Sequence, residues 1–109
     1  MATILETTKK LLGITNDYTV FDQDIIIGIN SAFLTLNELK VGPDIPFRIE
    51  TGNEEWTEFS NNPGVLNGAI QYIWLKTRLA FDPPTSSFVV DAIKNQISEL
   101  EFRLNVLSE

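Results

Sequence analysis

The chain has 109 residues, and its composition already excludes several classes of function. A chain of this length is expected to form one domain, residues 1–109, with enough buried surface for its own core. It contains no cysteine and no histidine, which removes disulfides, thiolate nucleophiles, sulfur-ligated metals and the commonest general base. Fifteen acidic residues outweigh eight basic ones and give a net charge of −7. Because the basic residues are scattered, tight binding to DNA or RNA is not expected.

The sequence also carries no sign of a membrane segment, a cofactor or a catalytic group. It has no run of about 18 apolar residues, as a transmembrane helix would need. Its first residues lack the basic start and apolar stretch of a signal peptide, so we expect synthesis and folding in a cytoplasm. Without histidine a Ser-His-acid triad is excluded, and no glycine-rich phosphate loop is present. No cofactor and no enzymatic activity are predicted.

Two helices are predicted in the first forty residues. Thr3 and Glu6 fit a capping box that begins a short helix over residues 4–12, and Gly13 is the expected left-handed stop. Asp22 is expected to cap a second helix that continues to about residue 40. One face of this helix carries a core stripe at helical spacing: Ile25, Ile29, Ala32, Phe33, Leu36 and Leu39.

Two aliphatic residues of the second helix, Ile27 and Leu34, fall on the side opposite that core stripe. Single exposed apolar residues are common in soluble proteins. They become informative only if another helix repeats the feature.

A long loop is predicted between the second helix and the next main helix. Glycine and proline in residues 41–46 break the helix, and residues 47–50 alternate in a way that permits a short extended segment. Residues 54–59 fit one helical turn, in which Trp56 and Phe59 hold the loop to the body. The three glutamates of this turn match no calcium or zinc spacing, so we expect a solvated acidic face.

The second half of the chain reads as a helical hairpin. The run over residues 65–81, begun by Asn62 and Pro63, is apolar nearly all round and predicts a buried central helix. The last helix, residues 87–107, has an inward seam at spacings of three and four residues: Val89, Ile93, Ile97, Leu100, Leu104 and Leu107. A second, weaker stripe lies well round the same helix: Phe88, Ala92, Phe102 and Val106.

The corner between these two helices is the sequence Phe81-Asp82-Pro83-Pro84. Proline cannot continue a helix, and it pushes the residue before it out of the helical region. Hydroxyls of the following residues, Thr85, Ser86 and Ser87, can then accept from the free amides of the last helix. The corner therefore decides how the last helix leaves the central one.

These patterns predict an all-α fold, a small bundle of about four helices with a long loop between the second and third main helices. The second, central and last helices carry more apolar surface than one small bundle needs. Because monomers seldom expose large apolar patches, the surplus indicates an oligomer or an assembly component. The predicted interface residues are Ile27, Leu34, Phe102 and Val106.

The order of motifs along the chain resembles the head-tail connector proteins of tailed bacteriophages. The residues that carry the resemblance are Leu12-Gly13-Ile14, Phe21-Asp22, Ile29-Asn30-Ser31-Ala32, Trp56, Phe81-Asp82-Pro83-Pro84, and Glu99 with Arg103-Leu104. Each motif occurs widely when taken alone. Their order and spacing over nearly the whole chain give the resemblance its weight.

The resemblance implies a helical subunit that assembles into a homo-oligomeric ring beneath the portal protein of a phage or prophage. Such a ring extends the channel through which DNA leaves and meets a tail-side connector or stopper protein. It also implies a virion component without catalytic residues. An acidic channel lining would repel phosphates, so DNA would pass without specific binding.

Two other readings stay open from the sequence. The same apolar stripes suit a small cytoplasmic adaptor or regulatory module that binds one protein partner. A small acidic enzyme that uses a pair of carboxylates is also compatible with the composition, although no spacing favours it.

Overall fold

The computed structural model describes residues 2–108. The two terminal residues of the predicted 1–109 domain lie outside that range. The described chain is helical, with one isolated β-bridge between Thr3 and Glu55. Its helices are α1 (Ile4–Leu12), α2 (Asp22–Glu38), α3 (Trp56–Phe59), α4 (Pro63–Phe81) and α5 (Ser87–Leu107). The predicted all-α fold is confirmed: four main helices are joined by a long loop that holds the single turn α3.

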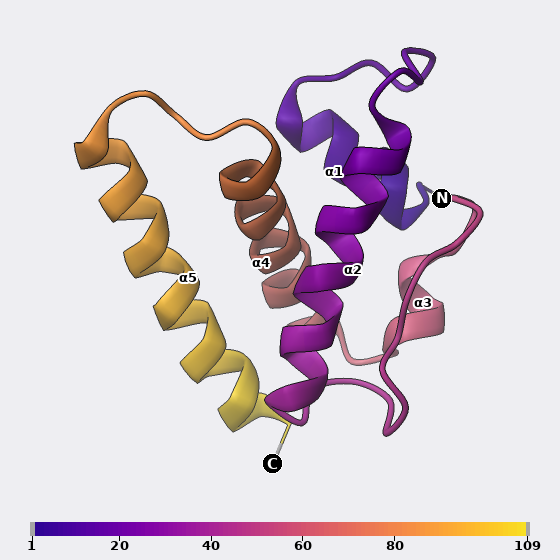
Figure 1. Cartoon of the computed structure of the whole chain (residues 1–109). Helices are drawn as coiled ribbons and strands as arrows, with labels where there is room; N and C mark the ends of the chain where they lie inside the picture. The colour runs from indigo at the N-terminus through magenta and orange to yellow at the C-terminus, as the bar shows by residue number, and fades with distance from the viewer. Residues whose placement is uncertain (1, 109) are drawn as a thin grey trace.

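Helix α4 is the centre of the arrangement. It contacts α1 and α2 on one side and α5 on the other (Figure 1). Its side chains Val65, Ala69, Tyr72, Ile73, Leu75 and Thr77 are buried, as expected for a helix with almost no polar face. The prediction of a buried central helix is therefore confirmed.

The caps of α1 follow from the sequence. The Glu6 amide donates to Thr3 Oγ1 over 3.1 Å, and the Thr3 amide donates to Glu6 Oε1 over 3.3 Å. Gly13 ends α1 with a φ of 83°, a left-handed conformation that costs glycine nothing because it has no Cβ. Both ends of this helix lie where the sequence predicts them.

The start of α2 differs from the prediction. Asp22 lies inside the first turn, Phe21 occupies the cap position, and no side chain caps the helix. The Asp22 carboxylate instead contacts Nζ of Lys9, 2.8 Å away. Lys9 is almost completely buried, and an unpaired buried charge is costly. Neutralising Lys9 therefore takes precedence over capping, and the prediction for Asp22 was wrong.

The loop between α2 and α3 contains no strand, and residues 47–50 are assigned to no helix or strand. Its backbone is bound by a side chain instead. The Asn30 carboxamide accepts from the Ile49 amide over 2.8 Å and donates to the Ile49 carbonyl over 2.9 Å. This pairing satisfies both backbone groups of a completely buried residue.

The glutamates around α3 serve the loop rather than only facing solvent. Glu54 accepts from the amides of Glu50, Thr51 and Gly52. Burial alone would raise the pKa of Glu54, but these backbone hydrogen bonds lower it below its usual value. Glu54 therefore binds the loop backbone, a role that the expectation of a solvated acidic face did not include.

Aromatic side chains hold the loop against the body, as the sequence suggests. Trp56 and Phe59 are buried, and the Trp56 indole donates to Thr7 Oγ1 over 3.1 Å. The Phe59 ring lies 4.9 Å from that of Phe33 and 5.6 Å from that of Phe47, between centroids. Such aromatic pairs add to the stability gained from burial alone.

Candidate partner-binding surfaces

Helix α5 packs on the rest of the molecule by one narrow face. Of its 21 residues, only Ile93, Ile97 and Leu104 are buried. Val89 and Leu107, the two ends of the predicted inward seam, are exposed. Only the middle of the seam is therefore packed against another helix, because α4 is the main neighbour of α5 in the described chain. The prediction of a fully inward seam was wrong at both ends.

Close packing and side-chain hydrogen bonds hold the C-terminal half of α5 against α4 and the end of α2. Leu104 lies so close to Gly68 of α4 that a Cβ added there would come within 2.7 Å of Leu104 Cδ2. The Tyr72 hydroxyl donates to Glu101 Oε2 over 2.7 Å. Asn105 Nδ2 donates to the carbonyl of Leu39, at the end of α2, over 2.8 Å. Burial, and then the hydrogen bond to Glu101, raise the pKa of the Tyr72 phenol.

The outward face of α5 carries a stripe of four apolar residues interrupted by two polar ones, which we call the α5 stripe. It consists of Phe88, Ala92, Asn95, Glu99, Phe102 and Val106, all of them exposed. Phe88 is 81% exposed and Phe102 is 71% exposed. Alternating steps of four and three residues keep the members of the stripe on one side of the helix, as in a coiled-coil seam.

The outward face of α2 carries a second apolar stripe, which we call the α2 stripe: Ile27, Ser31 and Leu34. Ile27 is 66% exposed and Leu34 is 53% exposed. A groove of about 440 Å³ runs between this stripe and the loop, lined by Ile27, Asn30, Ser31, Leu34, Pro46, Phe47 and Arg48. We call it the α2 groove.

The predicted interface residues form two surfaces rather than one. Ile27 and Leu34 lie on α2, and Phe102 and Val106 lie on α5, with α4 packed between the two helices (Figure 1). The sequence placed all four off the core stripes but did not separate them. It also missed the loop wall of the α2 groove, because no helical period links residues 46–48 to α2.

The corner between α4 and α5 forms as the sequence predicts. The Asp82 amide donates to the Arg78 carbonyl over 2.8 Å and closes α4. Ser86 caps α5 by accepting from the Val89 amide over 3.4 Å. The Phe81 ring lies edge-on to the Phe21 ring, 5.2 Å between centroids. This aromatic contact ties the corner to the segment before α2, a link that the sequence does not reveal.

The family of the chain follows from its similarity to known proteins. A family model described as "Phage connector protein" matches residues 4–109. The chain belongs to the phage connector protein family. The resemblance carried by the motifs from Leu12-Gly13-Ile14 to Arg103-Leu104 is thereby confirmed. Searches of curated proteins and of solved structures gave no match.

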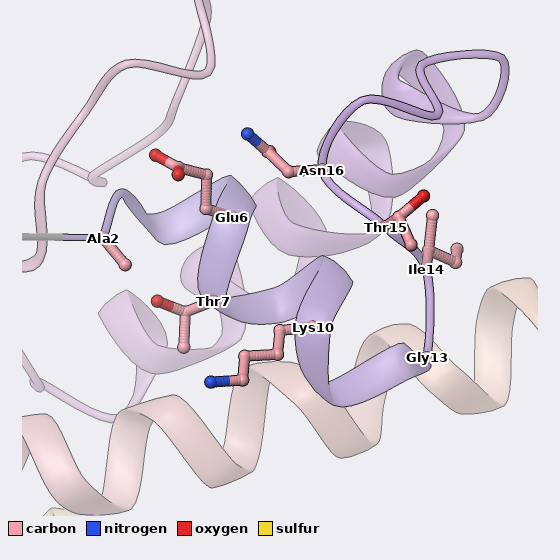
Figure 2. Close-up of a pocket in the computed structure, with 8 residues that line it drawn as sticks. All are labelled: Ala2, Glu6, Thr7, Lys10, Gly13, Ile14, Thr15 and Asn16. Carbon is pink, nitrogen blue, oxygen red and sulfur yellow. The ribbon is translucent and has the colours of Figure 1, made fainter.

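The largest pocket described in this connector protein lies along α1 (Figure 2). It is an open hollow of about 600 Å³ lined by Ala2, Glu6, Thr7, Lys10, Gly13, Ile14, Thr15 and Asn16. Glu6 already belongs to the capping box, and Thr7 already accepts from Trp56. Two of the polar side chains that line the hollow, Glu6 and Thr7, therefore serve the fold.

Further observations bear on the chemistry of this connector protein. Over residues 2–108, no group of three or more acidic side chains is placed to hold a metal ion. None of the helices in that range combines the length and the apolar character needed to cross a membrane. The features that stand out are therefore the two apolar stripes and the groove beside α2.

Proposed function

We propose that this connector protein is a structural virion component that forms a ring at the portal vertex and joins the phage head to the tail. The observation that carries the proposal is the family match over residues 4–109. The exposed stripes on α2 and α5 support it, because a ring subunit needs apolar surface on more than one side. The role requires no catalytic group.

The proposed partners are a portal protein on the head side and a connector or stopper protein on the tail side. The protein would be made in the host bacterial cytoplasm and retained in the virion. Its net charge of −7 suits a wall that DNA passes, since carboxylates repel phosphates and hold no strand in place. The ring would thus extend the DNA channel without specific binding.

The proposed subunit interface uses Ile27, Leu34, Phe102 and Val106. Burying a large apolar side chain contributes roughly 1.5–3 kcal/mol relative to leaving it exposed. Several such side chains at each contact, repeated round a ring, offset the mutual repulsion of acidic subunits. The ring need not form in isolation, because the portal can supply the template on which subunits gather.

The direct test is electron microscopy of the purified protein mixed with its portal protein. We expect a ring of density added to one end of the portal. Light scattering on Phe102→Glu should show reduced assembly at unchanged monomer stability. Val20→Glu, at a site that is 70% exposed on another surface, serves as the control.

Two results would contradict the proposal. If Phe102→Glu lowers monomer stability without any change in assembly, Phe102 belongs to the core and not to the interface. If the portal gains no density and the protein instead captures a single cytoplasmic partner, the adaptor reading replaces the ring. Phage portal, capsid and tail genes beside the coding sequence would count for the ring.

A further inference from the structure

We propose that neighbouring copies of this protein meet head to tail, with the α5 stripe of one copy seated in the α2 groove of the next. The inference rests on the proposed function, because it names the subunit contact of the proposed ring. It commits to one occupant for the groove, which is a second copy of this chain.

The two surfaces lie on different helices. Helix α4 contacts both α2 and α5 (Figure 1), and the stripe residues of each outer helix are exposed. The α2 stripe and the α5 stripe are therefore two distinct patches of one molecule. A contact between different patches is heterologous, and repeated copies of it give a closed ring or a filament.

The α5 stripe and the α2 groove also match in size and in apolar character. Phe102 and Val106 are one helical turn apart at the C-terminal end of the α5 stripe, where α5 is held most firmly. The groove offers apolar walls from Ile27, Leu34 and Phe47. Its volume of about 440 Å³ falls within the roughly 300–1,000 Å³ of pockets that enclose ligands, which is room for one or two large side chains.

The α2 groove and the α5 stripe also carry opposite charges. Arg48 stands at the groove with a side chain that is 68% exposed, and its nearest described acidic contact, Glu50, is 3.8 Å away. Glu99 lies within the α5 stripe, one turn before Phe102, and forms an ion pair with Arg103 of its own helix. Both side chains of that pair are exposed, and such pairs contribute little to stability, so Glu99 can exchange its partner for Arg48. A head-to-tail contact brings these opposite charges together. On an acidic chain such pairs select the orientation in which a copy can approach.

A two-fold pairing of α5 with a second α5 is the main competitor. It would match the α5 stripe with itself and place the Glu99 carboxylates of both copies in one apolar seam. Each Glu99 is paired with Arg103 of its own helix, so charge alone does not decide against this pairing. A two-fold contact closes on itself as a dimer, whereas the proposed ring needs a contact between different patches, and the groove offers Arg48 as a further partner for Glu99.

Cross-linking tests the proposal directly, because the natural chain contains no cysteine. Ser31→Cys places a thiol in the α2 groove, and Ser98→Cys places one beside Phe102, both on exposed residues. The two variants are mixed at high concentration, with and without the portal protein, and treated with a short bismaleimide reagent. We expect mixed dimers to exceed either homodimer, and we expect the double variant Ser31→Cys/Ser98→Cys to give a ladder of oligomers.

Thr15→Cys, an exposed site beside α1, mixed with Ser98→Cys gives the matched control for random collision. A yield from Ser31→Cys with Ser98→Cys that is no higher than this control overturns the proposal. A predominance of Ser98→Cys homodimers overturns it as well, in favour of the two-fold pairing. Preferential capture of a portal segment in the groove would overturn the assignment of the occupant.

Charge reversal gives a second measurement. Arg48→Glu should lower the mixed cross-linking yield about two- to five-fold, the range for a partly exposed ion pair. Combining Arg48→Glu on the groove subunit with Glu99→Arg on the α5 subunit should restore the yield. An equal loss in the combined pair would show that the two charges do not meet.

The same experiments separate this contact from the proposed function. A ring on the portal without preferential cross-linking between positions 31 and 98 refutes the head-to-tail contact and leaves the proposed function standing. Preferential cross-linking between positions 31 and 98 without any binding to the portal supports the head-to-tail contact and refutes the proposed function.

Discussion

The body formed by α1, α2 and α4 and the arm formed by α5 use their apolar residues differently. In the body, α2 buries Ile25, Ile26, Ile29, Ala32, Phe33 and Leu36. The arm is the longest helix, yet it buries only three side chains and exposes aromatic rings at Phe88 and Phe102. The body thus buries apolar side chains in the core, whereas much of the apolar surface of the arm is exposed.

The polar contacts of the two regions differ in the same way. The Lys9 ammonium is buried in the body, where it donates to the carbonyls of Asn16 and Tyr18 over 2.9 and 2.8 Å and pairs with Asp22. The arm instead has single hydrogen bonds to the body at Glu101 and Asn105, and its own ion pair, Arg103 with Glu99, is exposed. The comparison indicates that stability resides in the body, and it supports the proposal that the arm and the outer face of α2 meet a partner.

The largest loss of stability in the body is expected from Lys9→Met. Removing the ammonium leaves the Asp22 carboxylate and two backbone carbonyls without their partner. Breaking a buried ion pair from one side costs about 3–5 kcal/mol. We expect a loss of that size in the free energy of unfolding, measured by urea denaturation followed by circular dichroism.

The adjacent lysine gives the control for this variant. Lys10 is exposed, so Lys10→Met should change the free energy of unfolding by no more than about 0.5 kcal/mol. Equal losses for the two variants would mean that Lys9 is not the link between α1 and the start of α2.

A second prediction separates the two faces of the arm. Leu104→Ala removes the side chain that packs against Gly68, and we expect a loss of about 2–3 kcal/mol, toward the low end for buried leucine because the arm can shift inward. Phe102→Ala should change stability by about 0.5 kcal/mol or less, while weakening assembly on the portal. Urea denaturation and sedimentation velocity measure the two effects.

The contrast between the two faces of the arm is wrong if Phe102 stabilises the fold or has no part in assembly. A large loss of stability from Phe102→Ala would place that ring in the fold. Unimpaired assembly of Phe102→Ala would remove it from the interface.

The sequence predicted the helices well because their signals are local. Thr3 with Glu6, Gly13, Asn62 with Pro63, and Ser86 each act within a few residues, and each lies where a helix begins or ends. The exposed position of Ile27 and Phe102 follows from helical period in the same way. Both are outward in the structure because no helix packs over them.

The features that the sequence did not predict have a different cause, because they depend on contacts between residues far apart in the chain. Asp22 has the residue type of a cap, but only the fold shows that Lys9 needs its charge. The pairing of Asn30 with Ile49 and the loop wall of the α2 groove likewise depend on how the loop returns to α2. No pattern within a few residues encodes such contacts.

A smaller loss of stability than for Lys9→Met or Leu104→Ala is expected from the corner. Proline stabilises a compatible position by about 0.4–1 kcal/mol through the entropy of the unfolded chain, so Pro83→Ala/Pro84→Ala should lose about that much at each site. The corner also directs α5 away from α4, so we expect ring assembly to suffer at least as much as folding. Pro43→Ala, in the loop after α2, is the control for the entropic effect alone. If electron microscopy shows normal rings on the portal after both corner prolines are replaced, contacts at Leu104, Glu101 and Asn105 suffice to orient the arm. The corner would then serve only to end one helix and begin the next.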